Sequence, residues 1–127
     1  MHSPRASPDG QFIVALGTPT DHNLWLYERK TGRWSEPLDG KVIPGSPQWS
    51  NNGKYVYLGV MTPGKPGISV FRVAVKTRTL EHVARIDVPK GMIGLWGPWL
   101  GLAPDDSPLL LRDQSLQEIY AIVVDLP

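Results

Sequence analysis

The sequence predicts an all-β fold in which one short unit of strands recurs along the chain. Three observations lead to this prediction: no stretch keeps a helical apolar period, the apolar runs are short and broken by Gly or Pro, and related segments return at a regular spacing. The 127 residues include 13 Gly, 13 Pro and 5 Trp, which is typical of short strands joined by tight turns. Hydrophobic residues make up 41% and charged residues 20%, as in an ordinary folded domain.

The first unit is built around a tight turn. In Pro8-Asp9-Gly10, Pro presets φ, Asp bonds the backbone that follows, and Gly takes a positive φ. A short strand is expected before this turn and three more after it, the last two joined by a hairpin turn at Lys30-Thr31-Gly32. The expected strands are 4–6, 12–16, 23–28 and 33–36.

The second unit repeats the first. Gly53 stands 43 positions after Gly10, and segment 70–73 matches segment 24–27 at an offset of 46. Asn51-Asn52 replaces the Pro8-Asp9 pair, which is expected to loosen the turn and leave the strands intact. The expected strands are 46–50, 55–58, 70–73 and 79–86.

The third unit carries the same turn in a further variant. Asp105 follows Pro104 as Asp9 follows Pro8, and Asp106 occupies the glycine position. Strands are expected before the turn and over 109–111 and 118–124, so this unit is one strand short. The whole chain is therefore expected to form about eleven strands in one segment of three repeats. The repeat boundaries are approximately 1–45, 46–95 and 96–127.

A period of roughly 40 to 50 residues with four strands per unit is typical of β-propeller blades. Segments 7–16, 23–27 and 30–32 resemble the WD40-like repeat of the TolB propeller family. The closing segments 96–113 and 117–121 resemble the C-terminal end of bacterial regulators in which such a propeller follows a winged-helix or kinase domain. The resemblance implies a partial β-propeller of about three four-stranded antiparallel blades, the last incomplete.

Three blades cannot cover their own ends. A blade buries both sheet faces only between neighbours, so a row of three leaves two apolar end faces and two open strand edges. Closed propellers have four to eight blades. We expect the ends to be covered by a second copy in a homodimer, by neighbouring blades of a parent protein, or by a rearrangement.

Charge and composition exclude several classes of partner. The net charge of +1 gives no reason to expect nucleic acid, although the segment from Trp99 onward carries −4 and the rest +5. No apolar run is long enough to span a bilayer, and no signal peptide is visible, so a soluble segment without membrane insertion is expected. The absence of cysteine leaves the compartment open between periplasm and cytoplasm.

No arrangement of residues indicates catalysis, a metal or a cofactor. His2, His22 and His82 lie far apart, with no metal-ligand spacing. Single acids in turns do not form an oxygen cage, and neither a nucleophile-elbow motif nor a triad or carboxylate pair at a catalytic spacing is visible. We therefore expect no enzymatic activity and interpret six residues as structural turn positions: Asp9, Gly10, Asn52, Gly53, Asp105 and Asp106.

The tryptophans divide into two groups. Trp25, Trp34 and Trp49 stand at strand positions that recur between repeats, so packing between blades is expected for them. Trp96 and Trp99 flank a Gly-Pro turn that leads into the third unit, and they are the candidate interaction residues.

These features predict a non-catalytic protein-interaction or sensing module that belongs to a larger bacterial regulator. One alternative is an accessory propeller of a hydrolase or lyase that acts on a peptide or polysaccharide. A stable segment without activity of its own is a third interpretation. An interaction module predicts an exposed aromatic patch, whereas an enzyme predicts histidines and carboxylates that converge in a central channel.

Overall fold

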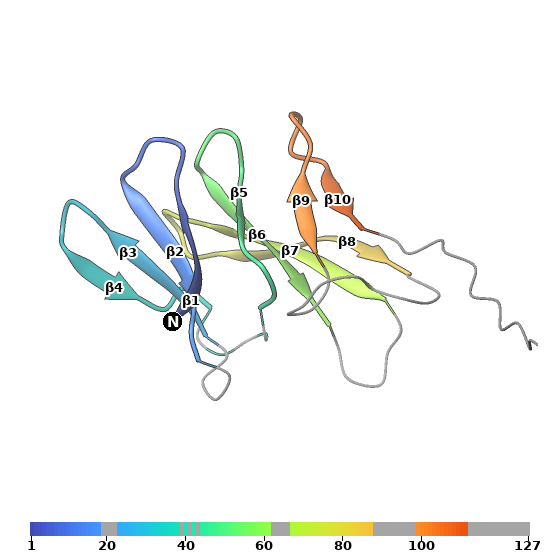
Figure 1. Cartoon of the computed structure of the whole chain (residues 1–127), viewed down its shortest axis with the longest axis horizontal. Coiled ribbons are helices and arrows are strands. Elements are labelled where there is room, and N and C mark those ends of the chain that lie inside the picture. The colour runs from blue at the N-terminus through green and yellow to red at the C-terminus, as the bar shows by residue number, and fades with distance from the viewer. Residues whose placement is uncertain are drawn as a thin grey trace, which may run out of the picture.

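The computed structural model describes residues 1–18, 23–38, 40, 42, 44–61, 67–87 and 99–111. Within these ranges ten strands form three antiparallel sheets, and no helix is present. Figure 1 shows the three sheets side by side in chain order. The prediction of an all-β fold made of consecutive propeller blades is confirmed.

The first sheet follows the chain from strand to neighbouring strand. Its four strands are β1 (His2–Ala6), β2 (Phe12–Leu16), β3 (Leu24–Glu28) and β4 (Arg33–Ser35), in that order. Gly10 and Gly32 have φ of 67° and 65°, which suits glycine at the two tight turns. β1 starts two residues earlier than expected, and its pairing with β2 shifts register between His2 and Arg5.

The second sheet repeats this meander. Its strands are β5 (Gln48–Trp49), β6 (Tyr55–Val60), β7 (Ile68–Ala74) and β8 (Leu80–Ile86). The turn between β7 and β8 has Arg78 at φ 59°, where the first sheet has Gly32. Arg78 N–H donates to the Ala74 carbonyl at 2.8 Å, as Gly32 N–H donates to Glu28 at 2.9 Å. The turn geometry is therefore kept although the glycine is not.

The third sheet is described as a hairpin. Its strands are β9 (Leu100–Leu102) and β10 (Pro108–Leu110), and the further strand expected at 118–124 lies outside the described residues. The first strands of consecutive sheets touch one another, β1 with β5 and β5 with β9. Trp49 Nε1 also donates to the Arg5 carbonyl at 2.9 Å, which joins the first two sheets.

The larger core lies between the first and second sheets. Strand alternation points Val14 and Leu26 of the first sheet toward Val56 and Leu58 of the second, and all four are buried. Apolar burial of this kind is the main stabilising contribution to folding. The complete buried cluster contains Val14, Leu16, Leu24, Leu26, Leu38, Val56, Leu58, Val73 and Val75.

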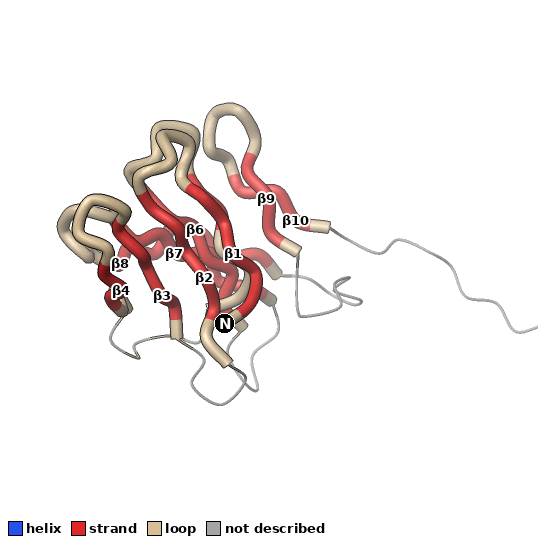
Figure 2. The backbone as a smooth tube through the Cα atoms, turned by 60° about the vertical axis from the view of Figure 1, so that its left-hand side comes forward, coloured by secondary structure: helices blue, strands red, loops and turns tan. Residues whose placement is uncertain are grey.

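A smaller core lies between the second and third sheets. It joins Tyr57 and Val70 to Leu100, with Leu102 and Leu110 packed against it. Both faces of the second sheet are therefore covered, as expected for a blade between two neighbours. The turns β1–β2, β5–β6 and β9–β10 lie along the same edge of the row of sheets, the upper edge in Figure 2, where they are next to one another.

Candidate interaction surface

The turn of the first blade is held by a small hydrogen-bond network. The buried hydroxyl of Ser7 donates to Asp9 Oδ1 at 2.6 Å and accepts the Phe12 N–H at 3.0 Å. Asp9 Oδ1 also accepts the Gln11 N–H at 3.0 Å. The Ser7 hydroxyl, followed by the Gln11 amide, lowers the pKa of Asp9 below its ordinary value. Turn formation accounts for every bond that Asp9 makes here.

The turn of the second blade keeps these bonds with a neutral side chain. Ser50 donates to Asn52 Oδ1 at 2.8 Å and accepts the Tyr55 N–H at 3.0 Å, while Lys54 N–H donates to Asn52 Oδ1 at 3.0 Å. Gly53 has φ 68°, nearly the same as Gly10. The expectation of a looser turn is wrong, because an amide oxygen replaces the carboxylate oxygen bond for bond.

The turn of the third blade is one residue shorter. Ser7 N–H donates to the Phe12 carbonyl and Ser50 N–H to Tyr55, five positions on, but Ala103 N–H donates to Ser107, four positions on. Asp106 has φ 64° at the glycine position, and Asp105 Oδ1 accepts the Ser107 N–H at 3.0 Å. The side chain of Ser107, followed by its backbone N–H, lowers the pKa of Asp105 below its ordinary value.

The shorter turn shifts the strand pairing of the third blade by one residue. Val56 pairs with Trp49 in the second blade, but the equivalent Leu109 pairs with Gly101 rather than with Leu102. A one-residue shift turns every side chain of a strand to the opposite face. Leu110 therefore packs toward the second blade, and Leu109 points away from it.

Two residues that differ from their equivalents in the first turn contact each other across blades. Asn51, at the position of Pro8, donates its backbone N–H to Asp106 Oδ1 at 2.8 Å. Its side-chain Nδ2 donates to the Pro104 carbonyl at 2.7 Å. Proline has no N–H and glycine no carboxylate, so the first blade's residues would not form the backbone bond. Asn51 and Asp106 thus join the second turn to the third.

Asp9 offers a test of the turn network through its pH dependence. Because its pKa is lower in the folded chain, Asp9 contributes stability that is present above about pH 3.9, its unfolded value. That stability is lost as the pH falls through the lower folded value. We expect Asp9→Asn to match the wild type at pH 7, since Asn52 already makes the same bonds, and to lose less stability on acidification. Thermal midpoints between pH 7 and pH 2 measure this.

The converse substitution is the control for this test. Asn52→Asp introduces a carboxylate into the same hydrogen-bond network and is expected to steepen the loss of stability below pH 4. Equal acid sensitivity of the wild type, Asp9→Asn and Asn52→Asp would contradict the proposed role of the Asp9 carboxylate.

Trp99 lies on the outward face of the third blade. Its side chain is 45% exposed, and its indole lies directly over Gly101, where an added Cβ would meet the ring. Leu109 and Leu111 have similar exposure on the same outward side. We call Trp99, Leu109 and Leu111 the third end face. Trp96, the other candidate interaction residue, lies outside the described residues.

The first blade exposes a second apolar face at the opposite end of the row (Figure 1). Leu24 and Leu26 of β3 point into the core, so the alternating Trp25 and Tyr27 point to the other side. Trp34 pairs with Tyr27, their ring centroids lie 5.2 Å apart, and Trp34 is 42% exposed. We call Ile13, Trp25, Tyr27 and Trp34 the first end face.

The expected packing of the tryptophans between blades therefore applies to Trp49 alone. Trp49 packs against the larger core, with its ring centroid 6.4 Å from that of Phe12. Trp25 and Trp34 occupy a face that no blade in the described residues covers. Their positions recur between repeats, but the first repeat has no described neighbour on that side.

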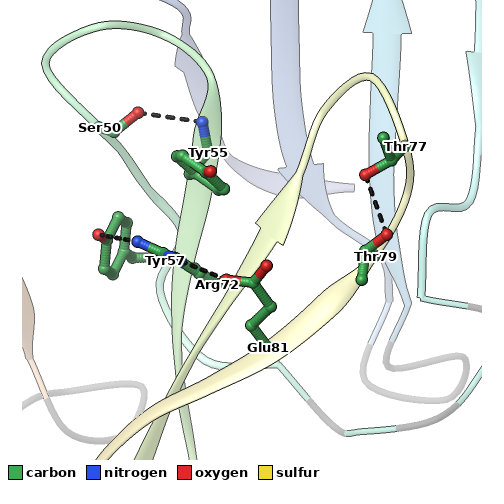
Figure 3. Close-up of polar contacts among 7 residues, drawn as sticks. All are labelled: Ser50, Tyr55, Tyr57, Arg72, Thr77, Thr79 and Glu81. Atoms are coloured by element: carbon green, nitrogen blue, oxygen red, sulfur yellow. Dashed lines mark hydrogen bonds and ion pairs between the residues drawn. The ribbon is translucent and has the colours of Figure 1, made fainter.

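A polar cluster on the second blade was not predicted from the sequence (Figure 3). Arg72 of β7 donates to Glu81 of β8 at 2.7 Å and to the Tyr57 hydroxyl at 3.5 Å. Its guanidinium carbon also lies 4.3 Å from the Tyr55 ring centroid. The hydrogen bonds to Tyr57 and then Glu81 raise the pKa of Arg72 above its ordinary value. Cross-strand partners thus neutralise Arg72, so we assign the cluster to sheet stability.

The histidines are not brought together in the described part of the chain. His2 contacts Ser3 at the start, His82 packs its ring edge-on against Phe71 in the second sheet, and His22 lies outside the described residues. Among residues 1–18, 23–38, 40, 42, 44–61, 67–87 and 99–111, no group of three or more His, Asp or Glu side chains is placed to hold a metal. Over the same ranges, no helix has the length and apolar character needed to cross a membrane.

Comparison with known proteins identifies the fold. No family model and no curated protein matches this chain. The crystal structure of TolB from Acinetobacter baumannii matches 83% of this chain and 24% of its own, with a TM-score of 0.61 and 19% identity. A structure assigned as TolB from Agrobacterium tumefaciens matches 73% of this chain and 31% of its own, with a TM-score of 0.51 and 20% identity. The chain thus has a TolB-like β-propeller fold and spans less than a third of either structure.

Proposed function

We propose that this chain is a non-catalytic protein-interaction module built from TolB-like propeller blades. The observation that carries the proposal is the third end face, where Trp99, Leu109 and Leu111 are exposed together on one hairpin. Clustered exposed apolar side chains mark interaction sites, and tryptophan is prominent among the residues that dominate binding energy. Antiparallel pairing holds Leu109 opposite Gly101, so the face is preorganised.

We further propose that the module belongs to a larger bacterial regulator. The sequence of its closing segment, 96–113, supports this context, because it resembles the end of regulators that carry a propeller after another domain. In such a protein the blades would present a binding surface while another domain carries the output. No observation on the described residues favours the alternative of an accessory propeller of a hydrolase or lyase.

Selection from a displayed peptide library tests the interaction module. The chain is immobilised at low density, so that copies do not meet, and peptides that bind it are enriched. We expect apolar or aromatic peptides whose affinity falls about ten-fold or more when Trp99 is replaced by Ser or Leu109 by Lys. Fluorescence polarisation of the synthesised peptides measures the affinity.

Val83→Lys is the matched control, since Val83 is an exposed apolar residue on the outermost strand of the second blade. It is expected to leave peptide affinity unchanged. Failure to enrich any peptide, or equal loss of affinity in all three variants, would argue against a binding role for the third end face. Circular dichroism of each variant excludes loss of the fold as the cause.

A further inference from the structure

We infer that a second copy of this chain covers the first end face, in a head-to-tail dimer. The inference rests on the proposed function and names the partner that an interaction module of this shape would take. The third blade of each copy would pack against the first blade of the other. Both end faces would then be buried in two identical contacts.

The repeats show what kind of surface the first end face accepts. Ile13 is equivalent to Val56, Tyr27 to Val73 and Trp34 to Leu80, at the offsets of 43 and 46 that relate the two units. Val56 and Val73 are buried against the first blade, and Leu80 packs against the same cluster. The first end face is thus the same surface through which the second blade receives its predecessor. The surface that fits it is the forward face of another blade, meaning the face that points toward the next blade in chain order.

The third end face is the surface of the last described hairpin that points away from the second blade, that is, forward along the row. Leu100 and Leu110 pack back onto the second blade, so Trp99 and Leu109 point forward along the row. A rear face and a forward face at opposite ends of one chain fit a heterologous contact rather than a symmetric pairing of like faces. In such a contact the first blade of one copy would follow the third blade of the other, as the second blade follows the first within this chain.

When copies of this chain alone assemble, the number of repeats in the given sequence favours a dimer over other closed rings. Each copy contributes three repeats, of which the structure describes two four-stranded sheets and the first hairpin of the third. Closed propellers contain about four to eight blades. Two copies supply about six blades and three copies about nine, so only two copies fall within that range. A ring of two copies would also leave no end face exposed to further growth.

Complementary variants test the direction of the contact as well as its existence. Ile13 is 37% exposed on the first end face, and Leu109 stands on the third end face. Lysine at either position places a charge in the contact and is expected to weaken pairing on the order of a hundred-fold. Light scattering after size exclusion, over a concentration series, measures the mass of the wild type, Ile13→Lys, Leu109→Lys and the control Val83→Lys. Val83 is 38% exposed, which matches Ile13.

We expect the wild type and Val83→Lys to be dimers and each end-face variant to be a monomer. A mixture of Ile13→Lys with Leu109→Lys should regain part of the dimer, because one of its two contacts joins the intact third end face of the first variant to the intact first end face of the second. Both lysines then lie in the other contact, so the mixed dimer should be weaker than the wild type. Pairing of like first faces predicts instead that Leu109→Lys stays dimeric and that mixing restores nothing. If Ile13→Lys does not fold by circular dichroism, Trp34→Ser replaces it.

A folded wild-type monomer at every concentration would overturn the head-to-tail dimer, as would a dimer that both end-face variants preserve. Neither result affects the outcome of the peptide selection, because that experiment is carried out on isolated immobilised chains. A monomer that binds peptides through Trp99 and Leu109 would remove the dimer and keep the interaction module. If the chain forms a dimer but its isolated copies bind no peptide, the binding role of the module would be limited to self-assembly.

Discussion

Replacing Leu58 with alanine is expected to lower the free energy of unfolding by about 2 to 5 kcal/mol, the range measured for buried leucines. Leu58 is 0% exposed and lies in the cluster between the first two blades. Truncation removes its apolar contacts and leaves a cavity that the two sheets, held by their hydrogen bonds, close only in part. For a domain of this size that is a large share of the net stability, which is typically about 5 to 15 kcal/mol.

Leu111 provides the matched comparison. It stands 53 positions after Leu58, as Asp106 stands 53 after Gly53, so the repeat alone would give both leucines the same environment. The shifted pairing of the third hairpin leaves Leu111 50% exposed instead. We expect Leu111→Ala to change stability by only about 0.5 kcal/mol, as is usual for surface substitutions.

Urea unfolding followed by circular dichroism measures both variants. They are compared in the Ile13→Lys background, so that association between copies does not contribute to the difference. A loss of several kcal/mol for Leu111→Ala would show that the third hairpin pairs in the register of the first two blades. The third end face would then have to be reassigned, because Leu109 would also point toward the second blade.

The sequence was sufficient to predict the sheets because their signals are local. Gly10 and Gly53 mark turns that only a positive φ allows, and the alternation of Val56 and Leu58 with Tyr55 and Tyr57 assigns the two sets of side chains to opposite faces of one strand. The ends of the strands were less exact: β1 begins at His2 and β6 continues to Val60. Pairing to a neighbouring strand, rather than the pattern within one strand, determines where a strand ends.

The facing of the third hairpin does not follow from the repeat, because its register depends on a turn with two coupled changes. Ala103 lacks the hydroxyl that Ser7 and Ser50 offer, and Pro108 lacks the N–H that those hydroxyls accept. Neither change leaves a polar group unsatisfied, so the turn is free to close one residue earlier. Comparing the three turns as whole hydrogen-bond networks, rather than residue by residue, would have revealed this pairing of changes.

The candidate surface was only partly accessible to sequence analysis for a related reason. Trp99 was identified because an aromatic residue beside a Gly-Pro turn is conspicuous. Ile13 and Leu109 were not, since an apolar residue in a strand is ordinarily assigned to the core. Whether it is buried depends on which blade stands next to it, and that information lies outside the segment that contains the residue. The equivalence of Ile13 with Val56 was nevertheless present in the repeat.

Gly67 is expected to be the most sensitive glycine among those that the structure describes. It precedes β7 with φ +90°, and an added Cβ would overlap the carbonyl oxygen of Ile86 and lie 3.1 Å from the Cα of Asp87. Both groups are backbone at the end of β8, and Ile86 pairs with Ile68 directly beside the glycine. A side chain here cannot be accommodated by a rotamer change, so the two strands would have to separate.

We therefore expect Gly67→Ala to cost about 2 to 5 kcal/mol, from about 1 to 2 kcal/mol of left-handed strain and about 1 to 3 kcal/mol of overpacking. Gly10→Ala isolates the first contribution, since Gly10 has φ +67° and no atom within 4 Å of an added Cβ. Asp106, at φ 64° in the equivalent turn, shows that a side chain is tolerated there. Urea unfolding of the two variants separates the cost of the left-handed backbone from the cost of the steric overlap. Equal losses would mean that the end of β8 yields to the new methyl group, and the close approach of β7 and β8 at Gly67 would then be a soft rather than a rigid feature of the second blade.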